Sequence, residues 1–139
     1  MHLPVLFIDR SRPVQILLGG VIPAAIGALQ GVLIGTSSAA YWAVAALAAI
    51  GMFLAGFEHR DGWGGADRGM VSGAIYATSL VVVHSLIGNH AKVSLGASRP
   101  VFVIFVTIIS ILIGALGGRI GRALRERAGT LPRDEQAAV

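Results

Sequence analysis

The sequence predicts an all-α membrane protein: a bundle of four transmembrane helices with both termini on the cytoplasmic side. Only 13% of the 139 residues are charged and 55% are hydrophobic, whereas an ordinary soluble domain has about 25% charged residues. Residues 14–57, 69–91 and 100–118 are stretches of 44, 23 and 19 positions without Asp, Glu, Lys or Arg. About 18 apolar residues are enough to cross a bilayer. These stretches therefore provide room for four spans.

The first stretch is long enough for two spans joined in a hairpin. The first span is expected over Val14–Gly35, which at about 1.5 Å per residue matches a hydrocarbon core of about 30 Å. Pro23 lies inside it, and membrane helices tolerate proline. A turn-like break at residues 35–38 separates it from the second span, Ala39–Phe57, where Tyr41 and Trp42 suit the membrane interface.

The other two stretches each provide one span. The polar segment 58–68 is expected to be a solvated loop, in which Asp61 or Asp67 can pair with Arg60 or Arg68. The third span is expected over Gly69–Gly88 and the fourth over Pro100–Gly118, since proline is allowed in a first helical turn. A basic extension (119–127) completes a single transmembrane domain over residues 1–128, and residues 129–139 form a mobile cytoplasmic tail.

The basic residues set the orientation of the four spans. Nine arginines fall on the side of the termini, against Lys92 and Arg99 on the other side. Basic loops stay in the cytoplasm, so both termini are expected inside. Ten of the eleven basic residues are arginine, which suits a GC-rich bacterial genome. The expected location is the bacterial cytoplasmic membrane.

Small residues recur four positions apart in three of the spans. Four residues are about one helical turn, so each set forms a strip that lets a neighbouring helix approach closely. Such strips pack one bundle together, or they form the interface of a homo-oligomer or a moving seam. The predicted helix-packing residues are Gly27, Gly31, Gly35, Gly69, Gly73, Gly114 and Gly118.

Polar side chains within the spans form a second candidate group. Gln30, Ser79, His84 and Thr107 are expected to form an intramembrane cluster in the outer leaflet. An ionisable residue within a span is costly and suggests a function, so His84 is a candidate proton acceptor or ligand contact. The alternative is a neutral histidine that is hydrogen-bonded to Gln30, a hydroxyl group or water.

Arginines follow the fourth span at intervals of three residues. Arg119, Arg122 and Arg125 are expected on a helix that leaves the bilayer, where each binds anionic lipid headgroups with about 1 kcal/mol. Recruitment of a soluble partner is the alternative. Basic cytoplasmic segments are sufficient to explain the net charge of +4, so no nucleic acid partner is expected.

Several classes of protein are excluded or disfavoured. The chain has no cysteine, which excludes disulfides and thiolate metal sites. The predicted spans contain no charged residue, whereas proton-coupled antiporters and acidic channel rings need embedded acids. Catalytic motifs are also missing. We therefore expect no enzyme, no metal and no cofactor.

The segments Gly51–Phe57, Asp61–Gly62 and Gly69–Gly73 form a glycine-rich arrangement. It resembles small four-helix membrane proteins of actinobacteria and haloarchaea that are labelled as domains of unknown function. The resemblance implies a similar bundle, and no functional residues are carried over from it. The favoured hypothesis is a non-enzymatic membrane protein that acts through glycine-strip packing, as a homo-oligomer or as an accessory subunit of a membrane complex. The alternative is a small channel, holin-like pore or carrier lined by the polar cluster.

Overall fold

The computed structural model describes residues 5–88, 90–96 and 98–127, and these contain helices but no strands. A 3₁₀ turn, η1 (Phe7–Asp9), precedes three helical segments that run on without a break. These are α1 (Arg12–Ile16), the π-helical turn η2 (Leu17–Val21) and α2 (Ile22–Thr36). The remaining helices are α3 (Ser38–Phe57), α4 (Gly62–Ile87) and α5 (Arg99–Arg127).

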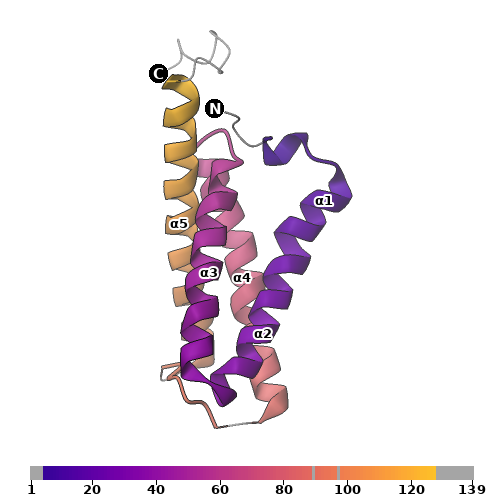
Figure 1. The fold of residues 1–139 in the computed structure, drawn as a ribbon, viewed down its shortest axis with the longest axis vertical. Helices are drawn as coiled ribbons and strands as arrows, with labels where there is room; N and C mark the ends of the chain where they lie inside the picture. Colours follow the sequence, from indigo (N-terminus) through magenta and orange to yellow (C-terminus); the bar gives the residue numbers. More distant parts are fainter. Residues whose placement is uncertain (1–4, 89, 97, 128–139) are drawn as a thin grey trace.

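The helices are arranged around α4 and α5, which pack against each other along their length (Figure 1). In addition, α2 packs against α4, and α3 packs against α5. The N-terminal segment and the C-terminal end of α5 lie at the same end of the molecule, which we call the terminal end. We call residues 5–21 the N-terminal arm; its helical part leans away from α3 and α4, and η1 turns back toward them (Figure 1).

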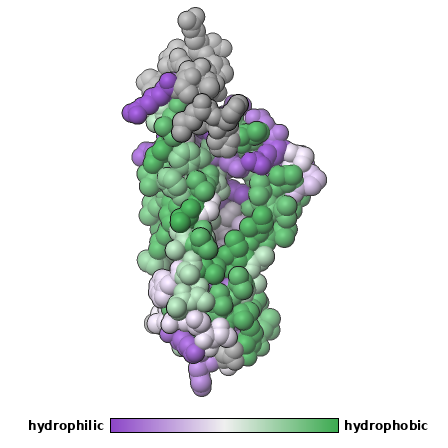
Figure 2. Space-filling view, viewed as in Figure 1, coloured by the Kyte–Doolittle hydropathy of each residue, from purple (hydrophilic) through white to green (hydrophobic). Residues whose placement is uncertain are grey.

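The outer surface is apolar, and four helical spans are long and apolar enough to cross a membrane. Large side chains that would be buried in a soluble protein face outward, including Leu47 (67% exposed) and Leu112 (64% exposed). Hydrophobic residues cover the middle of the visible face, and hydrophilic residues concentrate at its two ends (Figure 2). This distribution matches a protein solvated by lipid in the middle and by water at both ends.

The turn between the first two spans is a single residue. Ser37 has extended backbone angles, and its side chain accepts a hydrogen bond from the Ala40 amide at 3.3 Å, which caps α3. The other connection at this end of the bundle, between α4 and α5, begins at Gly88 with φ +70°, a value that glycine adopts without strain. Lys92 donates to the carbonyls of Ile34 and Thr36 through its amide and Nζ, so this connection covers the end of α2.

The third span begins seven residues earlier than the sequence predicted, because α4 starts at Gly62. The Asp61 side chain accepts a hydrogen bond from the Gly64 amide at 2.8 Å, which satisfies one of the free donors of the first turn. The predicted loop 58–68 was therefore wrong: only Glu58–Asp61 connects α3 to α4. Asp67 and Arg68 lie inside a helix, although the spans were expected to contain no charged residue.

The first span contains a π-helical turn directly before its proline. Pro23 has no amide hydrogen, so it cannot bond to the carbonyl of Gly19 four residues earlier. The Ile22 amide bonds to Leu17, five residues back, and thereby leaves the carbonyl of Leu18 as well. Two neighbouring carbonyls, Leu18 and Gly19, therefore lack the usual bond to the amide four residues later.

Candidate functional site

A crevice of about 910 Å³, lined by both charged and apolar side chains, lies between the N-terminal arm and the start of α4. One side is formed by arm residues such as Phe7, Arg12 and Gln15, and the other by the α3–α4 connection and the first turns of α4. A hollow beside the arm is visible in Figure 2. The charged residues that line it are Arg12, Glu58, Arg60, Asp61, Asp67 and Arg68.

The arm is attached to α4 at the two carbonyls that the π turn releases. Arg68 Nη2 donates to the carbonyl of Leu18 at 2.5 Å, and Ser72 Oγ donates to the carbonyl of Gly19 at 3.2 Å. The Arg68 guanidinium also lies over the Phe7 ring, 4.3 Å from its centroid. The irregularity at Pro23 thus creates the acceptors that α4 binds.

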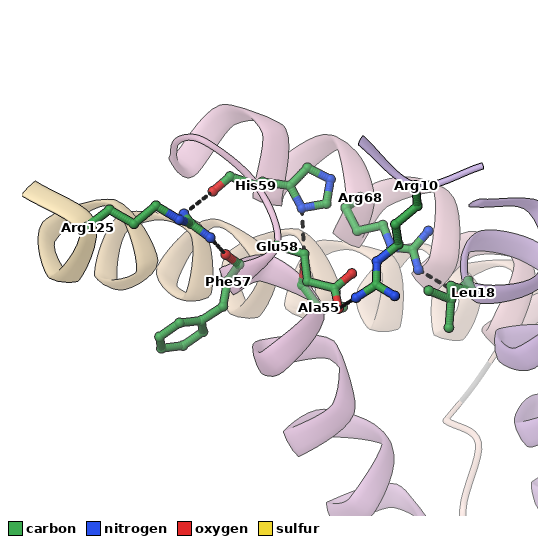
Figure 3. A network of polar contacts seen from close by, with 8 residues as sticks. All are labelled: Arg10, Leu18, Ala55, Phe57, Glu58, His59, Arg68 and Arg125. Atoms are coloured by element: carbon green, nitrogen blue, oxygen red, sulfur yellow. Dashed lines mark hydrogen bonds and ion pairs between the residues drawn. The ribbon is translucent and has the colours of Figure 1, made fainter. Parts of the chain in front are cut away.

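A second set of contacts joins the arm to the α3–α4 connection (Figure 3). Arg10 Nη2 and Glu58 Oε1 form an ion pair at 2.7 Å, and the Phe7 amide donates to the carbonyl of Glu58 at 2.7 Å. The Phe7 ring stacks on His59 with centroids 5.4 Å apart. The pairing of Glu58 with Arg10 was not anticipated, because the two residues are far apart in the sequence.

His59 is held at this corner by contacts on both sides. Its Nδ1 lies 3.1 Å from the carbonyl of Ala55, and its ring contacts Phe7. Burial lowers the pKa of His59, and the nearby Arg68 charge acts in the same direction. The bond to Ala55 and the carboxylates of Glu58 and Asp61 oppose this shift. The neutral imidazole is therefore favoured in the folded state.

Arg68 is the most informative residue of the crevice. Its relative exposure is 9%, and its Nε has no hydrogen-bond partner in the part of the chain that the structure describes. Among the described ion pairs none involves Arg68; Glu58, whose charge acts on it, is paired with Arg10. A buried cation without a bonded carboxylate is costly. Its position at the crevice makes an anionic group the natural complement.

The three arginines at the end of α5 do not form one lipid-facing row. Three residues turn a helix by about 300°, so positions 119, 122 and 125 spread over about 120°. Arg119 is exposed, and Arg122 pairs with Glu126 at 2.6 Å. Arg125 is only 6% exposed and donates to the carbonyls of Phe57 and His59 (Figure 3). The expected headgroup role was wrong for Arg125, which caps the end of α3.

The predicted polar intramembrane cluster does not assemble as expected. Gln30 is fully buried; its Nε2 donates to the carbonyl of Tyr41 at 3.0 Å, and its Oε1 accepts from the Tyr76 hydroxyl. Thr107 donates to Val103 in its own helix at 2.7 Å, and Ser79 lines an outer groove. His84 is buried, and its Nδ1 has no partner within the described ranges.

The glycine strips lie where helix backbones come closest. A Cβ at Gly65 would overlap the carbonyl oxygen of Gly114, and one at Gly114 would overlap that of Gly65. The same conflict with a neighbouring carbonyl or side chain arises at Gly27, Gly31, Gly69, Gly73 and Gly118. Gly35 is half-buried in the last turn of α2. These contacts lie within one chain.

Sequence reasoning assigned Glu58 and Arg68 to a solvated loop, and it did not single out Arg10, which joins the arm to Glu58. One signal could have found Arg68: Gly65 extends the strip of Gly69 and Gly73 by one turn and thereby places residue 68 in the helix. Within residues 5–88, 90–96 and 98–127 no group of His, Asp and Glu is arranged to hold a metal ion. Comparisons of the chain with family models, curated proteins and solved structures gave no match.

Proposed function

We propose that this is a non-enzymatic membrane protein that binds an anionic group in the crevice at its terminal end. The observation that carries the proposal is the buried guanidinium of Arg68, which has no bonded carboxylate among the residues that the structure describes and lines a cavity of about 910 Å³. The glycine-packed helices act in this proposal as the rigid support of the crevice.

The other charges of the crevice are compatible with an anion. Glu58 is already paired with Arg10, and one oxygen of Asp61 accepts the Gly64 amide at 2.8 Å. Asp67 is the exposed carboxylate on the first turns of α4. Arg12, at the start of α1, lines the same cavity and adds a second guanidinium, a group whose fork of donors suits carboxylates and phosphates.

Titration with a soluble phosphate ester tests this proposal. The protein is purified in nonionic detergent, and glycerol 3-phosphate is added while binding is followed by calorimetry. We expect saturable binding that Arg12→Gln weakens and Asp67→Asn strengthens, each by about twofold to fivefold, since a partly exposed charge contributes about 0.3–1 kcal/mol. Arg127→Gln, at the exposed end of α5, is the matched control and should change nothing.

Two results would overturn it. One is that the wild-type protein shows no saturable binding. The other is that Asp67→Asn leaves the affinity for the ester unchanged. An anion bound in the crevice is repelled by the Asp67 carboxylate, whereas the charge of Asp67 has no effect on binding if Arg68 is purely structural.

A role as a homo-oligomer or an accessory subunit is the second candidate. It is favoured by an open groove with many small residues between α2 and α4 and by Gly51 of α3, where an added Cβ would meet nothing within 4 Å. A pore lined by the polar cluster has less support, since Gln30 is buried between Tyr41 and Tyr76. Crosslinking in native membranes would reveal a self-ladder or a single foreign band for the second candidate.

A further inference from the structure

The crevice continues into an apolar groove on the outer face of α2 and α4. This outer groove has a volume of about 840 Å³ and is lined mainly by small and aliphatic side chains, among them Ala25, Ala28, Ala74 and Val82. Ile75 lines both the crevice and the groove, and Gly20 of the crevice is followed directly by Val21 of the groove. The two cavities therefore adjoin.

The crevice and the groove differ in chemistry in the same way as the headgroup and the acyl chain of a lipid. Charged side chains line the crevice at the terminal end, where the aqueous interface is expected, whereas no charged residue lines the groove, which runs along the membrane-spanning part of α2 and α4. A soluble anion would fill only the crevice. An acyl chain attached to the anion would cover the groove and stay within the apolar depth of the bilayer.

We infer that the ligand is an anionic phospholipid, whose phosphate lies beside Arg68 and Arg12 and whose acyl chain lies in the outer groove. This inference rests on the proposed anion site and adds the class of its ligand. The arginine distribution predicts that the terminal end is cytoplasmic, and anionic lipids are abundant in that leaflet. A lipid bound there would complement the Arg68 charge and fill the groove at the same time.

Lipid retention measured by native mass spectrometry tests the inference on the full chain. The protein is exchanged into detergent with equal amounts of phosphatidylglycerol and phosphatidylcholine. We expect preferential retention of phosphatidylglycerol, and Arg12→Gln should reduce this preference. Ala28→Phe, which fills the groove, should weaken retention about tenfold, or about 1.4 kcal/mol. Ala46→Phe, on the exposed face of α3, is the matched control and should retain the lipid.

Glycerol 3-phosphate separates this inference from the proposed function. If the soluble ester binds equally well to the wild type and to Ala28→Phe while lipid retention falls only in the variant, the acyl chain occupies the groove. If the ester binds but Ala28→Phe retains phosphatidylglycerol normally, the lipid inference is wrong and the anion site stands. If neither ligand binds, both fail.

A second copy of the chain is the competing occupant of the groove. The chain has no cysteine, so Ala28→Cys introduces a single thiol. Oxidation that gives a disulfide-linked dimer for Ala28→Cys but not for Ala46→Cys would overturn the lipid inference, because a helix of the second copy would then cover the groove. Absence of such a dimer supports it.

Discussion

The N-terminal half of α4 is held by different means on its two sides. Toward α5, the backbones of the two helices touch, and a Cβ at Gly65, Gly69 or Gly114 would overlap a carbonyl oxygen of the facing helix. Toward the N-terminal arm, contact is made by side chains that reach across. Arg68 and Ser72 bond to carbonyls of the arm, and Arg10 pairs with Glu58.

This difference distinguishes the α4–α5 seam from the N-terminal arm in how each responds to substitution. The α4–α5 seam depends on the absence of side chains, so its fit is decided by sterics and is insensitive to charge. The arm depends on a few polar bonds around a π-helical turn, a feature often found at functional sites. Substitutions that add atoms should therefore damage the seam, whereas substitutions that remove charge should release the arm.

The largest effect is expected from a methyl group in the seam. Gly65→Ala places a Cβ against the carbonyl of Gly114, so the helices must separate, and overpacking of this kind costs about 1–3 kcal/mol. Gly51→Ala is the matched control, because its Cβ meets nothing within 4 Å and alanine favours a helix over glycine by about 0.5–1 kcal/mol. SDS titration in mixed micelles, followed by circular dichroism, measures both. Equal stability of the two variants would contradict the close approach of α4 and α5.

A smaller effect, confined to the arm, is expected from Arg68→Gln. The substitution removes the donor to Leu18, and the loss of this half-buried hydrogen bond costs less than the roughly 1–3 kcal/mol of a fully buried carbonyl left without a partner. Spin labels at Ile8→Cys and Trp63→Cys report the separation of the arm from α4, since both positions are exposed. We expect a longer and broader distance distribution in Arg68→Gln. An unchanged distribution would mean that Arg68 does not hold the arm.

Arg127→Gln provides the control for the spin-label measurement. It removes one positive charge at the same end of the molecule, from an exposed position on the last turn of α5. The distance between the labels should then equal that of the wild type. A shift of similar size in this variant would attribute the movement to net charge.

Much of the fold could be predicted from the sequence, because lipid imposes long apolar stretches that are visible without a structure. The four spans follow from the charge-free runs, and Ser37 breaks the first run where a turn-like segment was expected. The basic extension is helical as far as Arg127. The predicted tail 129–139 lies outside the described residues.

The site was largely hidden from the sequence, because its contacts join residues far apart in the chain. Arg10 and Glu58 are separated by 48 positions, and Arg68 and Leu18 by 50. Because the third span was taken to begin after the last charged residue, Arg68 was placed in a loop, although Asp61 can cap a helix that begins at Gly62. Arg125 was misassigned because residues spaced three apart do not lie on one face of a helix: each step of three changes the direction of the side chain by about 60°.

The smallest effect is expected from the protonation of His59. Burial lowers its pKa, so below about pH 6.5, the ordinary value, the unfolded or released state takes up the proton more readily than the folded state. The stability that the neutral imidazole provides is therefore complete above this pH and is lost as the pH falls below it. The arm contacts His59 through Phe7, so the same spin labels should show a modest broadening between pH 7.5 and pH 5.5. His59→Phe keeps an aromatic ring against Phe7 and cannot titrate. Its distance distribution should stay constant over this range, and a persistent pH response in that variant would assign the effect to another group.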